Sequence, residues 1–89
     1  MKIINPATEE SIAELVADTK GSVHLKIARL KEGQKEWKKV PLDERLACII
    51  RFGELVRNNV EGLATLLTSE TGKPIQQSRN EIRGAQNRV

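Results

Sequence analysis

The sequence has 89 residues, 15 of them basic and 12 acidic, with a formal net charge of +3; 38% of it is hydrophobic and 2% aromatic. A chain of this length fits one small domain with a thin stability margin, because it buries only about 60–65% of the surface that its unfolded state exposes. The single cysteine excludes an internal disulfide, no cysteine–histidine cluster has metal-ligand spacing, and no apolar run reaches the length of a membrane span.

The first residues, Met1-Lys2-Ile3-Ile4-Asn5-Pro6, are too few and become polar too early for a secretory signal. Together with the lack of disulfides, this predicts a cytoplasmic protein. Ile3 and Ile4 form a short β-like run that Asn5-Pro6 interrupts, and a second apolar run covers residues 12–16. We therefore expect a two-stranded hairpin within residues 1–20, with its loop over residues 5–11. Such a ribbon is marginal alone in water and has to pack on another surface.

A first helix is predicted over residues 22–37, with Ser22 as its N-cap. Its apolar residues recur at helical spacing and form one face, which consists of Val23, Ile27, Leu30 and Trp37. The opposite face is charged and carries Lys26, Arg29, Lys31, Glu32, Lys35 and Glu36.

A second helix is predicted after Lys38-Lys39-Val40-Pro41, from a cap at Asp43 to about Arg57. Its apolar stripe is wide, which indicates contact with more than one neighbour, and it consists of Leu46, Ile49, Ile50, Phe52, Leu55 and Val56.

Asn59 is the expected cap of a third helix over residues 60–70, whose core candidates are Leu63, Ala64, Leu66 and Leu67. Gly72 follows at the position where a glycine adopts the left-handed conformation at low cost. Pro74 begins a fourth helix, because its missing N–H costs nothing in the first turn. We find no stop signal before Val89, so we expect this helix to continue to the last residue and the chain to be truncated there.

Four features of the sequence are candidates for chemical sites. Cys48 has apolar neighbours, which favours a packing role over that of a nucleophile, since a nucleophile needs a nearby cation or helix N-terminus. His24 has no recognisable nucleophile or acid as a partner, so a surface or packing role is favoured for it too. Thr71-Gly72-Lys73 does not fit a phosphate-binding loop, because Leu67 and Pro74 stand where that loop needs a glycine and a hydroxyl residue. The basic group at residues 31, 35, 38 and 39 alternates with acids, which is typical of a solvated face.

Three segments, in this order and spacing, give the chain its resemblance to a known family. They are Asn5-Pro6-Ala7-Thr8 before a second strand, Trp37 followed by Pro41 and Glu44-Arg45, and Glu70-Thr71-Gly72-Lys73-Pro74. Together they resemble the N-terminal part of the NAD(P)-dependent aldehyde dehydrogenase superfamily, over essentially the whole chain. The family usually has a glycine where Glu9 stands, and because glycine suits a tight turn better, the sequence leaves the geometry of this turn open.

The resemblance implies a parent enzyme of α/β fold that oxidises an aldehyde, such as a short-chain semialdehyde, to a carboxylic acid. In this family a cysteine attacks the aldehyde, hydride passes to NAD or NADP, and a glutamate activates the water that hydrolyses the thioester. The cysteine, glutamate, oxyanion asparagine and cofactor glycines of the family lie beyond the stretch resembled here, and Cys48 matches no family motif. We therefore expect no catalytic, cofactor-binding or metal-binding residue in this chain and no activity of the chain alone.

The resulting interpretation is a mostly α chain, with about four helices after a short hairpin. Residues 1–89 are read as a single piece, the N-terminal part of the cofactor-binding domain of the parent, with the hairpin in residues 1–20 and the helices in residues 21–89. The expected partners are the remainder of the parent enzyme and a second copy of the chain, held through exposed apolar helix faces. Nucleic acid and membrane are not expected partners. Two alternatives remain open, a free-standing helical protein-interaction module and a small basic nucleic-acid binder.

Overall fold

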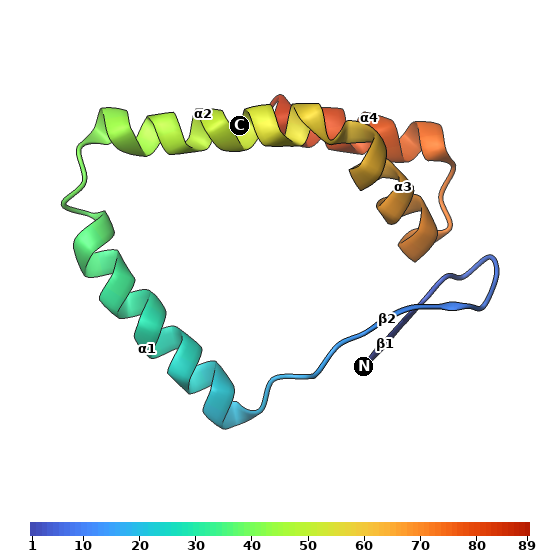
Figure 1. Cartoon of the computed structure of the whole chain (residues 1–89), viewed down its shortest axis with the longest axis horizontal. Coiled ribbons are helices and arrows are strands. Elements are labelled where there is room, and N and C mark those ends of the chain that lie inside the picture. The colour runs from blue at the N-terminus through green and yellow to red at the C-terminus, as the bar shows by residue number, and fades with distance from the viewer.

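The chain begins with two antiparallel strands and continues as four helices in the computed structural model, which describes residues 1–89 (Figure 1). The strands are β1 (Lys2–Ile4) and β2 (Ser11–Glu14), and the helices are α1 (Lys20–Trp37), α2 (Leu42–Asn58), α3 (Val60–Thr71) and α4 (Ile75–Gln86). The predicted hairpin and four helices are thereby confirmed, and the chain is mostly helical.

The loop of the hairpin is closed by its first residue and contains one strained position. The side chain of Asn5 accepts from the amide of Ala7 at 2.9 Å, and the Asn5 amide donates to the carbonyl of Glu10 at 2.9 Å. Glu9 has a φ of 62°, the left-handed conformation that glycine adopts most easily. The sequence did not decide the geometry of this turn. In the structure Glu9 takes the backbone conformation of a glycine, at the position where the family usually has one.

Replacing Glu9 with glycine is expected to stabilise the hairpin by up to about 1 kcal/mol, because glycine removes most of the cost of the left-handed conformation. Amide hydrogen exchange measures this at the amide of Leu15, which donates to the carbonyl of Met1 at 2.8 Å across the hairpin. Thr8→Gly is the control, since Thr8 has no positive φ. Faster exchange at Leu15 in Glu9→Gly would contradict the prediction.

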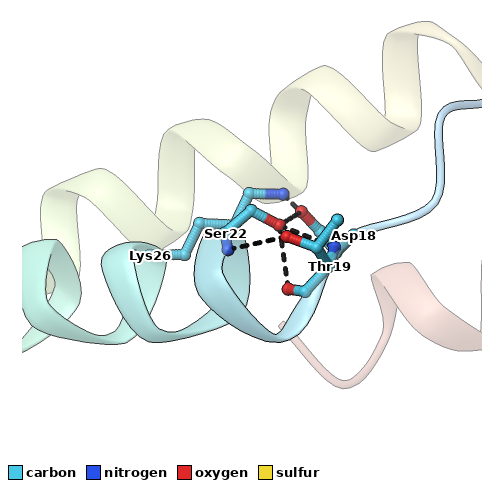
Figure 2. Close-up of polar contacts among 4 residues, drawn as sticks. All are labelled: Asp18, Thr19, Ser22 and Lys26. Carbon is cyan, nitrogen blue, oxygen red and sulfur yellow. Dashed lines mark hydrogen bonds and ion pairs between the residues drawn. The ribbon is translucent and has the colours of Figure 1, made fainter.

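The start of α1 differs from the prediction. The N-cap is Thr19, whose hydroxyl accepts from the amide of Ser22 at 3.1 Å, while the hydroxyl of Ser22 accepts from the amide of Thr19 at 2.9 Å (Figure 2). This reciprocal arrangement is a capping box with serine at its third helical position. The expected cap at Ser22 was wrong because Thr19 supplies the earlier hydroxyl and leaves Ser22 to close the box.

The starts of α2 and α3 also lack the expected side-chain caps. Pro41 is the N-cap of α2, and Asp43 lies inside the first turn, where its charge favours the positive end of the helix. Asn59 is the N-cap of α3 as predicted, but its side chain donates backwards to the carbonyl of Leu55 at 2.7 Å and does not bond an amide of α3. The side chain of Asn59 thus bonds the end of α2 and gives α3 no side-chain cap.

The left-handed glycine between α3 and α4 forms as predicted, but Pro74 is the N-cap of α4 and not its first helical residue, and the end of α4 also differs from the prediction. Gly72 takes the left-handed conformation with a φ of 73°, and its amide donates to the carbonyl of Thr68 at 2.8 Å. Helix α4 ends at Gln86, so the expected continuation to the last residue was wrong. The final residues close in tight turns, with the amide of Val89 donating to the carbonyl of Gln86 at 3.2 Å.

Helices α3 and α4 pack most closely on each other, and α2 lies against both. Two fully buried residues mark this packing, Ala64 on α3 and Ser78 on α4. The hydroxyls of Thr68 and Ser78 are 2.8 Å apart and satisfy each other between the two helices. Small residues therefore hold the best-packed part of the chain, because they let the helix backbones approach.

The rest of the molecule is open. Hairpin, α1, α2 and the α3–α4 pair follow one another around an open centre, and α1 packs closely on no other element (Figure 1). The radius of gyration is 17.3 Å, where a compact chain of this length has about 12 Å. The accessible surface is 7219 Å², where a compact monomer of this mass exposes about 5,200 Å². The excess is comparable to the area that a large protein interface buries.

The predicted apolar faces form but are not covered. Among the core candidates of α3 only Ala64 is buried, and Leu63 and Leu66 remain exposed. The two aromatic side chains are also open, with Trp37 at 42% and Phe52 at 54% exposure. The helices are thus amphipathic as the sequence predicts, while the surfaces that would cover their apolar faces are not part of this chain's own packing.

Candidate functional site

A polar cluster fixes the start of α1 (Figure 2). The carboxylate of Asp18 accepts from the ammonium of Lys26 at 2.7 Å and from the hydroxyl of Ser22 at 2.7 Å. These hydrogen bonds, the one from Lys26 first, lower the pKa of the Asp18 carboxyl below its ordinary value. All four residues in the figure serve to begin the helix, and the cluster is exposed, so its ion pair contributes little stability.

A second polar cluster joins α3 to α4. The guanidinium of Arg79 donates to both carboxylate oxygens of Glu61, at 2.9 and 3.1 Å from Nε and at 2.9 Å from Nη2. The hydrogen bond from Arg79 lowers the pKa of Glu61, and the same bond raises the pKa of Arg79. Lys73 lies between α3 and α4, and its ammonium forms an ion pair with the carboxylate of Glu81 on α4 at 2.6 Å. Both ion pairs therefore lie within the α3–α4 unit.

Cys48 lies on α2 and is half-buried. Its sulfur accepts a hydrogen bond from the Nη2 of Arg51 at 3.0 Å, three residues along the same helix. No imidazole or carboxylate contacts the thiol through a hydrogen bond, so the group has no base to activate it. The Arg51 guanidinium is a nearby cation that the apolar sequence neighbours of Cys48 did not predict, and a packing role for Cys48 stays a prediction.

The other three features lie on the surface or at a helix junction. His24 is exposed on α1, and its imidazole takes part in no hydrogen bond. In Thr71-Gly72-Lys73, the glycine ends α3 and the ammonium of Lys73 is held by Glu81, as expected for a helix junction and not for a phosphate-binding loop. In the basic group, Lys35 pairs with Glu32 at 2.9 Å and Lys39 with Glu36 at 2.8 Å.

The net charge of the whole chain resides on α1. This helix carries five basic and two acidic residues, a formal charge of +3, and the remaining residues balance ten basic against ten acidic side chains. Taken at 3.6 residues per turn from Leu30, Lys20 and Lys31 stand on one flank of the apolar face, Arg29 and Glu36 stand on the other, and Lys26 lies within the face. One flank of the apolar face is thus basic, and the other carries both signs.

A shallow, open hollow lies on this helix. It is lined by Lys26, Arg29, Leu30, Gly33, Gln34 and Trp37. A Cβ placed on Gly33 would have no atom within 4 Å, so the glycine leaves free space between its neighbours. Gly33 is not among the residues predicted to matter; the signal for it in the sequence is a glycine inside a helical pattern, between the apolar positions 30 and 37.

The chain contains no group of three or more histidine, cysteine, aspartate or glutamate side chains placed to hold a metal ion. None of its helices has the length and apolar character needed to cross a membrane.

Comparison with known proteins places these features in a family context. The sequence model of the aldehyde dehydrogenase family matches residues 1–89. The chain is 36% identical to 3,6-anhydro-alpha-L-galactose dehydrogenase of Vibrio sp. (strain EJY3) over 81 residues, which are 91% of this chain and 17% of that protein. It is 38% identical to malonate-semialdehyde dehydrogenase 2 of Bacillus mycoides (strain KBAB4) over 78 residues, which are 88% of this chain and 16% of that protein.

A third relative is 5-carboxymethyl-2-hydroxymuconate semialdehyde dehydrogenase of Escherichia coli, 34% identical over 78 residues, or 88% of this chain and 17% of that protein. The chain thus spans about a sixth of the length of the curated relatives it matches. No solved structure matches it.

Proposed function

Because the chain belongs to the aldehyde dehydrogenase family, we propose that it is the N-terminal supporting segment of an NAD(P)-dependent enzyme that oxidises an aldehyde to a carboxylic acid. The single observation that carries this proposal is the match of the family over residues 1–89 in a chain whose apolar helix faces lie open. A supporting segment contributes apolar surface to a larger fold and needs little core of its own.

The proposed chemistry belongs to the whole enzyme. A cysteine of the parent forms a thioester with the substrate carbon, and NAD or NADP accepts the hydride. A semialdehyde is the proposed substrate class, in keeping with the names of two of the relatives. We propose that this chain holds no catalytic, cofactor-binding or metal-binding residue, and that its residues form one piece of the cofactor-binding domain in a cytoplasmic enzyme.

The proposed role of the chain is to present two surfaces to the remainder of the parent. One is the wide apolar stripe of α2, on which Leu46, Ile49 and Phe52 are about half exposed. The other is the hairpin, which touches the helices where Pro6 approaches Gly72. Covering such surfaces contributes on the order of 25 cal/mol for each Å² of apolar area removed from water, so the remainder of the enzyme would stabilise this segment substantially.

A chimera tests the supporting role directly. The part of the malonate-semialdehyde dehydrogenase 2 of Bacillus mycoides that aligns with this chain is replaced by residues 1–89, and reduction of NAD is measured with malonate semialdehyde. An active chimera is expected, because the segment supplies support and no reacting group. An inactive but folded chimera would contradict the proposal, and the same relative without any segment serves as the control.

The chain alone is expected neither to bind NAD(P) nor to reduce it with any aldehyde. The catalytic and cofactor-binding residues of the proposed enzyme belong to the remainder of the parent chain. Isothermal titration calorimetry with NAD and NADP measures binding, and absorbance at the reduced nicotinamide band measures turnover. Saturable binding of either nucleotide to residues 1–89 would overturn the proposal that the chain holds no cofactor-binding residue.

In isolation the chain is expected to self-associate through the apolar faces of α2 and α3, since exposed apolar patches of this extent seek burial. Size-exclusion chromatography with light scattering measures the mass. The double change Phe52→Glu and Leu66→Glu places charge on both faces and is expected to shift the mass toward that of a monomer. A monomer of the unaltered chain at high concentration would contradict this prediction.

A free-standing helical interaction module is the second candidate function, favoured by the openness of α1. Under this alternative the chain folds cooperatively alone and exchanges its partners, whereas a supporting segment alone is only loosely ordered. A urea titration followed by circular dichroism separates the two. We propose no nucleic-acid or membrane partner, because the basic residues of α1 alternate with acidic and apolar ones instead of forming a basic stripe.

A further inference from the structure

The chain divides into two parts at the junction of α1 and α2. Residues 1–40 contain the hairpin and α1 and are here called the arm, and residues 41–89 contain α2, α3 and α4 and are called the body. Every hydrogen bond and every ion pair of the chain lies within one of these parts, and none joins the arm to the body. Only the covalent link and van der Waals contact therefore hold the two parts together.

The junction has the properties of a hinge. The amides of Lys38, Lys39 and Val40 donate back to carbonyls of α1 at 3.0–3.1 Å. Pro41 has no amide hydrogen, and its carbonyl accepts from the amide of Arg45 in α2 at 3.1 Å. Val40 can therefore change its backbone dihedral angles without breaking a hydrogen bond of either helix. A residue before a proline still ranges over about 80° in φ, which is enough to swing the arm.

The arm returns to the body at the loop of the hairpin, which lies beside the turn between α3 and α4 (Figure 1). A Cβ built on Gly72 would lie 3.0 Å from the Cγ of Pro6 and 3.8 Å from its Cβ, and no other residue that is distant in sequence would come within 4 Å. The proline ring approaches this closely because Gly72 has no side chain. Pro6 nevertheless stays exposed, so the contact removes little apolar surface from water and is weak.

We propose that the arm is a strap, latched on the body by the contact of Pro6 with Gly72, and that it opens and closes about Val40 in solution. A latch of one apolar contact, without a hydrogen bond or an ion pair, separates the open and closed states by a small free energy, so both are populated. The latch also explains how a change at position 72 reaches the hairpin through space. The inference is independent of the proposed enzymatic role.

Double electron–electron resonance measures the distance between the arm and the body in the full chain. Spin labels are attached through Ser11→Cys in the hairpin and Gln77→Cys on α4, both at exposed positions, after Cys48→Ala has removed the native thiol. A second pair, Glu54→Cys on α2 with Gln77→Cys, lies within the body and is the matched control. An excess of unlabelled chain is added, so that association of copies contributes no distance.

The pair within the body is expected to give one narrow distance. The pair between arm and body is expected to give a short distance and a longer, broader one, the latter from about a tenth of the molecules or more. Gly72→Asn keeps the left-handed turn and places a Cβ against Pro6, so it is expected to raise the ratio of open to closed molecules about threefold or more. Pro6→Ala removes the proline ring and is expected to act in the same direction. Thr8→Ala, in the same loop, is expected to leave the ratio unchanged.

Three results would overturn the proposal. A single narrow distance between arm and body that neither Gly72→Asn nor Pro6→Ala alters would mean that the arm is rigidly attached. A broad distribution that neither variant shifts would mean that the contact holds nothing. A broad distribution for the pair within the body would remove the division into arm and body. The chimera reads enzyme activity and this experiment reads distances in the chain alone, so the two proposals fail separately.

Discussion

Replacing Ser78 with leucine is expected to lower the free energy of unfolding by about 2–3 kcal/mol, the largest effect that we expect from one substitution. Ser78 has no exposed surface, and its hydroxyl lies 2.8 Å from that of Thr68 across the α3–α4 contact. A larger side chain has no room there, so α3 and α4 must separate or distort. The change also leaves the hydroxyl of Thr68 without its partner.

A urea titration followed by far-ultraviolet circular dichroism measures this loss, and amide exchange along α3 and α4 reports it where the transition is not cooperative. Gln77→Leu adds the same side chain at the neighbouring, exposed position and is the matched control, expected to stay within about 0.5 kcal/mol of the unaltered chain. Equal losses in both variants would mean that the burial of Ser78 is not what holds the two helices together.

Gly72→Ala is expected to lower the free energy of unfolding by about 2 kcal/mol. Both reasons concern the Cβ atom that alanine adds. The residue has a φ of 73°, a conformation that costs an L-residue about 1–2 kcal/mol. A Cβ at Gly72 would also lie 3.0 Å from the Cγ of Pro6, so the hairpin would have to move away from the α3–α4 turn. The substitution therefore strains the turn and loosens the contact of the hairpin with the helices.

The same unfolding experiment measures the loss, and a second glycine provides the control. Gly62 lies in α3, where a Cβ built on it would meet no atom within 4 Å, and Gly62→Ala is expected to stabilise the chain by up to about 1 kcal/mol. Gly72→Asn separates the two causes, because asparagine tolerates the left-handed conformation but still brings a Cβ against Pro6. A stabilising effect of Gly72→Ala would refute the account of this turn.

The sequence alone determined the family, the number and order of the helices and the left-handed glycine at position 72. These features depend on signals that lie close together in the chain. Apolar residues recur at helical spacing, and the glycine followed by Pro74 ends one helix and begins the next through the conformations of those residues themselves. The hairpin was likewise predictable, because Asn5-Pro6 separates two short apolar runs.

The tertiary structure decided which of several local signals prevailed. Thr19 and Ser22 could each cap α1, and the capping box used both. The family usually has a glycine at position 9, and Glu9 adopts the left-handed conformation in the loop that joins β1 to β2. Local sequence ranks such options weakly, since their energies differ by about 1 kcal/mol.

Only the tertiary structure could show which apolar positions are covered. The periodicity of α1 and α2 identifies an apolar face, but burial depends on what lies opposite, and that surface comes from distant segments or from a partner. Ala64 and Ser78 are buried because α3 and α4 meet there, whereas Leu30 and Phe52 have nothing packed over them. Side-chain identity sets which residues favour burial, and the arrangement of the helices in space determines which of them achieve it.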